Sequence, residues 1–108
     1  MEEYNYFFEI DEESGKDRVF VLVIYDIMDN SKRTRLAKKL QGYGIRVQKS
    51  AFEALIDKKK YKKLLNELKQ YVSKEDGDSI RIYKIIGKGQ VTSFGADINH
   101  ELDDVIVI

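Results

Sequence analysis

The segment from residue 19 to residue 25 constrains the fold more than any other part of the sequence. It reads VFVLVIY, an almost unbroken run of β-branched and aromatic residues, which is typical of a strand buried on both faces. The run ends at Asp26. An ionised carboxylate at the end of a buried strand is costly unless it is paired, solvated or bound to a cation. We therefore predict a central strand over residues 18–27 with a candidate functional carboxylate near its end.

A basic amphipathic helix is expected directly after this strand. Asp29-Asn30-Ser31 supplies N-cap chemistry, and a helix over residues 30–43 would bury a stripe formed by Leu36, Leu40 and Tyr43. Two glycines, Gly42 and Gly44, bracket the end of this helix, and either can supply the positive φ angle of a C-cap.

The middle of the chain is expected to continue with an extended segment, a second helix and a strand. Residues 45–56 are extended, but their apolar alternation changes parity near Gln48–Ser50, so a tight hairpin and one kinked strand both fit. Asp57 caps a helix over residues 58–72 with a strong 3.6-residue apolar period. Ser79–Ile86 is expected to be a strand.

The order β-α-β-β-α-β is the split βαβ, or ferredoxin-like, pattern. We therefore predict an α+β fold in which two helices cover one face of an antiparallel sheet. The other face is partly apolar in this sequence and needs a cover, which a second protomer would provide. The length of 108 residues implies one domain. We place it at residues 18–108, after an N-terminal extension at residues 1–17.

The two ends of the chain are less constrained. Tyr4–Ile10 fits an extra edge strand or a disordered leader, with a turn at Glu12–Lys16 before the central strand. Gly87-Lys88-Gly89 is expected to break the chain before a short strand at Gln90–Phe94. The apolar terminus Val105–Ile108 would be an aggregation risk if exposed, so we expect it to pair with another protomer or a partner protein.

Charge is distributed unevenly along a chain whose formal net charge is zero. Residues 31–74 hold 14 Lys and Arg against 3 Asp and Glu, whereas the segments before and after them are acidic. A basic middle indicates a polyanion-binding surface, although lysine-rich helices that are simply solvated fit as well. Without cysteine there is no disulfide or thiolate metal site. Without a bilayer-length apolar run or a signal peptide, we expect a cytoplasmic protein without membrane contact.

Carboxylates are the best candidates for chemistry, because the only histidine, His100, lies in a polar, glycine-bounded segment. Asp26 is a candidate ligand for Mg²⁺ or Mn²⁺, which prefer oxygen donors. One carboxylate makes a weak site, but a two-fold dimer would bring two copies together. Asp26 fits equally well as a helix cap or as a partner of local backbone amides. Asp29 is more consistent with a cap than with a ligand.

Arginines are the second group of candidate functional residues. The planar guanidinium group of arginine suits phosphate and can stabilise charge that develops in phosphoryl transfer. Arg33 and Arg35 lie in the first turns of the helix after Asp26, and Arg46 begins the next extended segment. Surface salt bridging fits these arginines equally well. Ser50 fits a phosphate or water contact or a structural hydroxyl, and Phe52 fits the core.

The sequence resembles the family of CRISPR-associated protein two, a small protein of the spacer-acquisition machinery. The resemblance covers residues 19–86 and rests on three blocks of residues: Ile24-Tyr25-Asp26-Ile27-x-Asp29-Asn30, Lys32-Arg33-x-Arg35-Leu36-Ala37-Lys38-x-Leu40, and Tyr43-Gly44-x-Arg46-Val47-Gln48-x-Ser50-x-Phe52-Glu53. Residues 1–17 extend beyond the usual start of the family, and the tail from Gly87 does not align with it.

The resemblance implies a ferredoxin-like homodimer in which a C-terminal strand packs on the partner's sheet. It implies a Mg²⁺ site, with Mn²⁺ as an alternative, formed by Asp26 from both chains. It also implies metal-dependent cleavage of single-stranded RNA or double-stranded DNA, and a scaffold role in the CRISPR integrase complex with integrase subunits as partners. The catalytic residues that it implies are Asp26, Arg33, Arg35, Arg46, Ser50 and Phe52.

Three functions therefore remain open from the sequence. The first is a Mg²⁺-dependent phosphodiesterase, and the second is a purely structural DNA-binding adaptor of the integrase complex. The third is an RNA-cleaving toxin on a related fold, against which the motif blocks argue. The first two share a basic nucleic-acid-binding surface that we place on Lys32, Arg33, Arg35, Lys38, Lys39 and Arg46.

Overall fold

The computed structural model describes residues 3–10 and 18–95. Its main sheet has four strands in the order β3-β4-β2-β5, and every neighbouring pair is antiparallel. The strands of this sheet are β2 (Arg18–Asp26), β3 (Ile45–Gln48), β4 (Ala51–Asp57) and β5 (Ser79–Ile85). The helices are α1 (Asn30–Gln41) and α2 (Lys58–Leu68), followed by the 3₁₀ turns η2 (Lys69–Tyr71) and η3 (Lys74–Asp76). The order β2-α1-β3-β4-α2-β5 confirms the predicted ferredoxin-like pattern.

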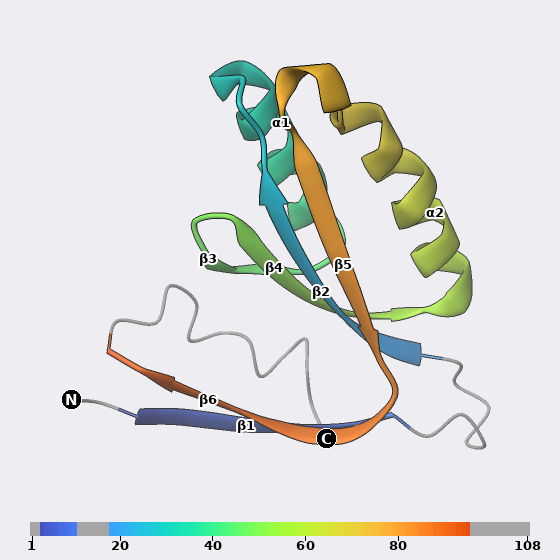
Figure 1. Ribbon diagram of the computed structural model, residues 1–108. Helices are drawn as coiled ribbons and strands as arrows, with labels where there is room; N and C mark the ends of the chain where they lie inside the picture. The colour runs from blue at the N-terminus through green and yellow to red at the C-terminus, as the bar shows by residue number, and fades with distance from the viewer. Residues whose placement is uncertain (1–2, 11–17, 96–108) are drawn as a thin grey trace.

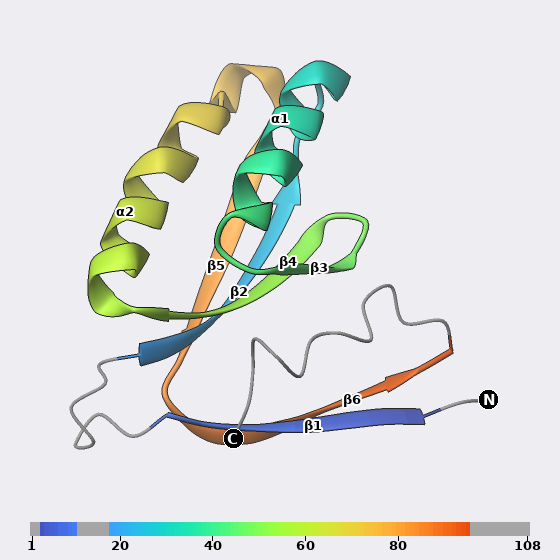
Figure 2. The ribbon, with the colours of Figure 1, turned by 180° about the vertical axis from the view of Figure 1, so that it is seen from behind.

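Both helices cover the same face of the main sheet, as Figures 1 and 2 show from opposite sides. The odd-numbered residues of β2 face the helices, since successive side chains of a strand alternate between faces. The core lies between these layers and contains Val19, Val21, Val23, Tyr25, Ile27, Leu36, Ala37, Leu40, Phe52, Ala54, Ile56, Leu64 and Leu68. The apolar run of β2 therefore supplies the centre of the core.

The parity change near residues 48–50 is a tight hairpin. β3 ends at Gln48 and β4 begins at Ala51, and the register between them shifts between Arg46 and Gln48. The hairpin alternative is therefore the correct one. Neither glycine at the end of α1 has a positive φ angle, so that expectation was wrong. Gly44 is needed for close approach instead, because a Cβ atom there would lie 2.1 Å from the carbonyl oxygen of Glu53.

A second, two-stranded sheet lies on the side away from the helices (Figures 1 and 2). It consists of β1 (Glu3–Ile10) and β6 (Gly87–Phe94), which are antiparallel. The extra strand near the N-terminus is thus present, but it pairs with β6 and not with an edge of the main sheet. The chain does leave the main sheet after Ile85, and Gly87 has a positive φ angle of 101°. The strand expected at Gln90–Phe94 is present but starts earlier, because Gly87-Lys88-Gly89 already belong to β6.

The β1–β6 sheet covers part of the helix-free face of the main sheet, which we call the open face. Phe8 of β1 stacks on Phe20 of β2 with ring centroids 4.3 Å apart. Tyr6 also donates its hydroxyl hydrogen to the buried carboxylate of Glu53 in β4. Ile24 and Tyr83 on the same face stay 41% exposed. The chain thus covers part of a face that we expected a second protomer to cover.

Replacing Phe8 with alanine is expected to release the β1–β6 sheet from the open face. The buried stack on Phe20 would be lost, and truncation of a buried phenylalanine costs about 3–5 kcal/mol. Amide hydrogen exchange, measured by mass spectrometry, should accelerate over Gly87–Phe94 while residues 19–25 stay protected. Phe7→Ala is the matched control, because Phe7 is 56% exposed. Unchanged exchange in Phe8→Ala would contradict the packing described.

Several expectations fall outside the described residues. These are the turn at Glu12–Lys16, the loop that contains His100, and the pairing of Val105–Ile108. Among the helices in the described ranges, none has both the length and the apolar character needed to cross a membrane.

Candidate metal and nucleic-acid site

The candidate site gathers at the end of the main sheet where β2 stops. Asp26 is the last residue of β2 and pairs in register with Ser79, the first residue of β5. Strand alternation places Asp26 on the open face, opposite to Tyr25. The Asp26 side chain is exposed. Within residues 3–10 and 18–95, its carboxylate makes no hydrogen bond or ion pair.

The helix cap, one of the two structural roles considered for Asp26, belongs to Asp29. The Oδ2 atom of Asp29 accepts a hydrogen bond from the backbone N–H of Lys32 at 2.7 Å. Asp57 does the same for α2, accepting from the backbone N–H of Lys60 at 2.7 Å. Both predicted caps are confirmed, and the Asp26 carboxylate is left for a different role.

Arg33 folds back over the loop that follows Asp26. Its Nη1 atom donates to the carbonyl oxygen of Ile27 at 2.8 Å, and its Nη2 atom donates to Oδ1 of Asn30 at 2.5 Å. A guanidinium carries five N–H donors in a fixed fork, so these two contacts hold the group beside the strand end. Arg33 thereby links α1 to the residue next to Asp26.

Arg46 and Tyr25 meet at the β3–β4 turn. Arg46 donates to the carbonyl oxygen of Lys49 from Nε at 3.1 Å and from Nη2 at 2.5 Å, and the Tyr25 hydroxyl donates to the same oxygen at 3.2 Å. Burial raises the pKa of Tyr25, partly offset by the positive charges of Arg46 and Arg33. The two arginines therefore lie close to one phenol at this end of the sheet.

The sequence did not single out Tyr25 as part of the site. The only signal is its position directly before Asp26, and an aromatic residue at the end of an apolar run indicates a buried strand and no more. The backbone N–H of Tyr25 also donates to the carbonyl oxygen of Ser50 at 3.0 Å. This residue thus joins the strand end to the β3–β4 turn through both its backbone and its side chain.

Ser50 directly precedes β4, and Phe52 is the second residue of that strand. Ser50 is half-buried in the turn. Phe52 is only 2% exposed, and its ring centroid lies 6.3 Å from that of Tyr25. The structure therefore places Phe52 in the core, where it supports Tyr25.

The basic side chains of α1 divide into two groups. Arg35 and Lys38 are exposed, and Nη1 of Arg35 donates to Oγ of Ser31 at 2.8 Å. Lys39 is also exposed, and its Nζ atom lies 3.4 Å from Oε2 of Glu67 in α2. Lys32 instead turns its ammonium group inward to Asp78 at 2.5 Å. Arg35, Lys38 and Lys39 of the predicted basic surface are therefore exposed, as expected. Lys32 is instead held in an internal ion pair.

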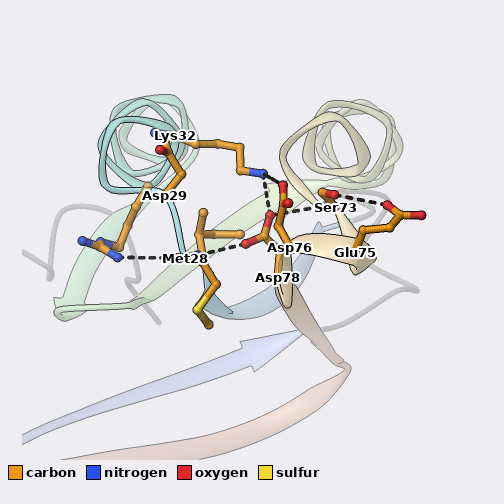
Figure 3. A network of polar contacts seen from close by, with 9 residues as sticks. Met28, Asp29, Lys32, Ser73, Glu75, Asp76 and Asp78 are labelled. Atoms are coloured by element: carbon orange, nitrogen blue, oxygen red, sulfur yellow. Dashed lines mark hydrogen bonds and ion pairs between the residues drawn. The ribbon is translucent and has the colours of Figure 1, made fainter.

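Asp78 is the second functional residue that the sequence pattern does not single out, since it stands beside two other acids and a glycine in Glu75-Asp76-Gly77-Asp78. Its side chain is 0% exposed. It accepts hydrogen bonds from Lys32 Nζ, from the backbone N–H of Met28 at 2.9 Å and from the backbone N–H of Ser73 at 3.1 Å (Figure 3). The hydrogen bond from Lys32, followed by that from Met28, lowers the pKa of Asp78 from 3.8 to about 2.

This low pKa predicts an acid-sensitive contribution to stability. The folded protein holds Asp78 ionised below its ordinary pKa of 3.8, so the stabilisation is present above that pH and is lost as the pH falls towards 2. Asp78→Asn lacks this titration. In urea denaturation, wild type should exceed Asp78→Asn in stability near neutral pH, and the difference should shrink below pH 4. A difference that does not change with pH would contradict the assignment.

The described part of one chain does not provide a full set of metal ligands. Residues 3–10 and 18–95 contain no group of three or more His, Asp or Glu side chains that could hold a metal ion. At this end of the described sheet, Asp26 presents the exposed, unpaired oxygen donors that Mg²⁺ prefers. Among the described residues, the donors of this site fit a hard cation when a second copy adds its own carboxylate.

One family model and two curated relatives are similar to this chain. A family model described as CRISPR associated protein Cas2 matches residues 19–92. A protein named CRISPR-associated endoribonuclease Cas2 from Mycobacterium tuberculosis (strain CDC 1551 / Oshkosh) is 48% identical over 95 residues, covering 87% of this chain and 82% of the relative. A CRISPR-associated endonuclease Cas2 from Halalkalibacterium halodurans is 36% identical over 96 residues, covering 82% of this chain and 99% of the relative.

Two crystal structures are similar to the fold described above. The hypothetical protein TT1823 from Thermus thermophilus superposes with a TM-score of 0.66 at 34% identity, covering 74% of this chain and 94% of that chain. Streptococcus pyogenes Cas2 superposes with a TM-score of 0.56 at 32% identity, covering 63% of this chain and 86% of that chain.

Proposed function

This chain belongs to the CRISPR associated protein Cas2 family, and from that premise we propose that it is a homodimeric nuclease of CRISPR spacer acquisition. Its reaction is the Mg²⁺-dependent hydrolysis of phosphodiester bonds in single-stranded RNA or double-stranded DNA. The observation that carries the proposal is the exposed Asp26 carboxylate at the end of β2, which has no polar partner within the described ranges. Relatives named endoribonuclease and endonuclease support it.

The proposed dimer packs through the part of the open face that β1–β6 leaves uncovered. Ile24 and Tyr83 are both 41% exposed there, and Ile24 precedes Asp26 by two residues on the same face. A two-fold axis near these side chains would bring the two Asp26 carboxylates together. At about 4 Å, two such charges repel by roughly 4 kcal/mol at an effective dielectric of about 20, so the pair would favour a divalent cation.

Each chain contributes defined groups to the proposed reaction. The two Asp26 carboxylates would hold Mg²⁺, with Mn²⁺ as a substitute. A bound ion of this kind lowers the pKa of water and offsets phosphate charge. Arg33 and Arg46, fixed on the carbonyl oxygens of Ile27 and Lys49, would stabilise negative charge at the phosphate. Arg35 and Lys38 on the exposed side of α1 would hold the flanking backbone.

A second candidate function is a non-catalytic DNA-binding adaptor for integrase subunits. The exposed cations of α1 and α2 favour it, because they form a basic surface that does not depend on Asp26. On α1 these are Arg35, Lys38 and Lys39, and on α2 they are Lys58, Lys59, Lys60, Lys62 and Lys63. The two functions are compatible in one dimer, so the test must separate binding from cleavage.

The test is cleavage of end-labelled single-stranded RNA and duplex DNA with Mg²⁺, with Mn²⁺ or with EDTA, alongside a binding assay on the same substrates. Metal-dependent cleavage by the purified dimer supports the nuclease. Duplex binding without cleavage under every metal condition would reject the nuclease and leave the adaptor.

Salt dependence gives a separate prediction for the basic surface. Neutralising one phosphate of duplex DNA contributes about 0.9 to the slope of log binding constant against log salt. The double substitution Arg35→Ala and Lys38→Ala is therefore expected to flatten the slope by roughly 1.8 units. Filter binding over a range of NaCl concentrations measures it. A slope equal to that of wild type would remove these two side chains from the phosphate contacts.

A further inference from the structure

We propose that Asp78 is a positioning residue for Asp26, because its buried carboxylate fixes the loop that follows β2. The inference rests on the proposed function, since it assigns a role in holding the cation-binding carboxylate. Asp78 contacts neither substrate nor metal in this proposal. It acts through the backbone of Met28, two residues beyond Asp26.

Three segments that are distant in sequence converge on the Asp78 carboxylate. Met28 comes from the β2–α1 loop, Lys32 from the first turn of α1, and Ser73 from the segment after α2. Figure 3 shows Lys32 reaching across from α1 towards Asp78, with Ser73 beside it on the α2 side. One carboxylate thus ties the start of α1 and the loop after Asp26 to the start of β5.

Asp78 is unsuited to binding the cation itself. Its side chain is 0% exposed, and its two oxygens already accept hydrogen bonds from three donors. It also directly precedes Ser79, the register partner of Asp26. Because side chains alternate along a strand, Asp78 and Asp26 belong to opposite faces of the sheet. The two carboxylates are therefore neighbours through the backbone and cannot share one ligand.

The loop after Asp26 is braced from two sides. Arg33 donates to the carbonyl oxygen of Ile27 at 2.8 Å, and Asp78 accepts from the N–H of Met28 at 2.9 Å. The two residues that follow Asp26 therefore each have a backbone group held by a charged side chain. A site holds a ligand best when the elements that present its side chains are fixed before binding.

The negative charge of Asp78 is essential to this brace. Lys32 has a side chain that is only 18% exposed, and its second acidic neighbour, Asp76, lies 3.9 Å away. An asparagine at position 78 would leave the ammonium group of Lys32 with weaker compensation. An asparagine side chain has one oxygen that accepts hydrogen bonds and one NH₂ group that only donates. Because three donors face this side chain, the NH₂ group would point at one of them, and at least one of the present hydrogen bonds would be lost.

Mn²⁺ affinity measured by calorimetry on the dimeric proteins tests this role. Asp78→Asn is expected to bind Mn²⁺ about tenfold more weakly than wild type, at the low end of the range for residues that orient metal ligands. Asp26→Ala is expected to abolish binding. Glu67→Gln is the matched control, because Glu67 is a half-buried carboxylate that pairs with Lys39 between the helices. It should leave Mn²⁺ affinity unchanged.

All measurements are made at a temperature where circular dichroism shows each variant to be folded. Amide exchange at Met28, followed by NMR, should accelerate in Asp78→Asn, which ties the loss of affinity to the loop. If Asp78→Asn does not fold, Asp78→Glu takes its place. That variant keeps the charge but displaces the carboxylate by one methylene group, and it should also weaken Mn²⁺ binding.

The outcomes separate the two proposals. Wild-type Mn²⁺ affinity in a folded Asp78→Asn dimer, with binding lost in Asp26→Ala, would overturn the positioning role and leave the proposed metal site intact. An equal loss of Mn²⁺ affinity in Glu67→Gln would show that any loss of stability weakens binding. That result would also overturn the positioning role of Asp78. If wild type and Asp26→Ala behave alike, the metal site fails and the positioning role fails with it.

Discussion

Replacing Asp26 with alanine is expected to lower Mg²⁺-dependent cleavage by about 100-fold or more. Asp26 is the only carboxylate of the described ranges that we place at the metal, and each protomer of the proposed dimer would lose its ligand. A hundredfold loss corresponds to about 2.7 kcal/mol of transition-state stabilisation, within the several kcal/mol that a catalytic metal supplies. Initial rates on labelled single-stranded RNA and duplex DNA, at saturating Mg²⁺, measure the effect.

Asp29→Ala is the matched control for this experiment. Asp29 lies three residues from Asp26 and is also exposed, but its carboxylate caps α1. Its loss should cost about 1 kcal/mol of stability and leave cleavage near the wild-type rate. Analytical ultracentrifugation establishes that all three proteins are dimers. An Asp26→Ala dimer that cleaves as fast as wild type would rule out Asp26 as the metal ligand.

Replacing Phe52 with alanine is expected to lower the free energy of unfolding by about 3–5 kcal/mol, the cost of truncating a buried phenylalanine. Phe52 is 2% exposed and packs in the main core beside Tyr25. A domain of this size is typically stable by only about 5–15 kcal/mol, so the variant would be close to unfolding at elevated temperature. Urea denaturation followed by circular dichroism measures the change.

Phe52→Leu separates a core role from a chemical one. Leucine keeps the site apolar and most of its volume, so the loss of stability should be smaller than for alanine. Cleavage per folded dimer should remain close to wild type, since a buried ring supports Tyr25 without touching substrate. A stable Phe52→Leu dimer without activity would instead show that the aromatic ring contributes to the reaction.

The local elements of this fold were predictable because their signals lie within a few residues. The apolar run before Asp26 predicted β2, and the carboxylates of Asp29 and Asp57 predicted two helix starts, which their hydrogen bonds confirm. The parity change near residue 49 predicted a hairpin or a kink, but it left the choice between them open. Pairing of β3 with β4 resolved it.

The supporting contacts of the site were not predictable in this way. Asp78 looks like one acid of a turn, Glu75-Asp76-Gly77-Asp78, and nothing near it in sequence names Met28 as its partner. The two residues are 50 positions apart. Tyr25 ends an apolar run and therefore looks like an ordinary buried strand residue, whereas its hydroxyl reaches the carbonyl oxygen of Lys49.

The sequence by itself determined the ferredoxin-like order of elements, the capped helices and an acidic residue at the end of the central strand. Only the tertiary structure decided that β1 pairs with β6 and that Asp78 clamps the loop after Asp26. The physical reason is the range of the interactions. Caps and periodicity depend on neighbours along the chain, whereas strand pairing and buried ion pairs depend on which distant segments the closed core brings into contact.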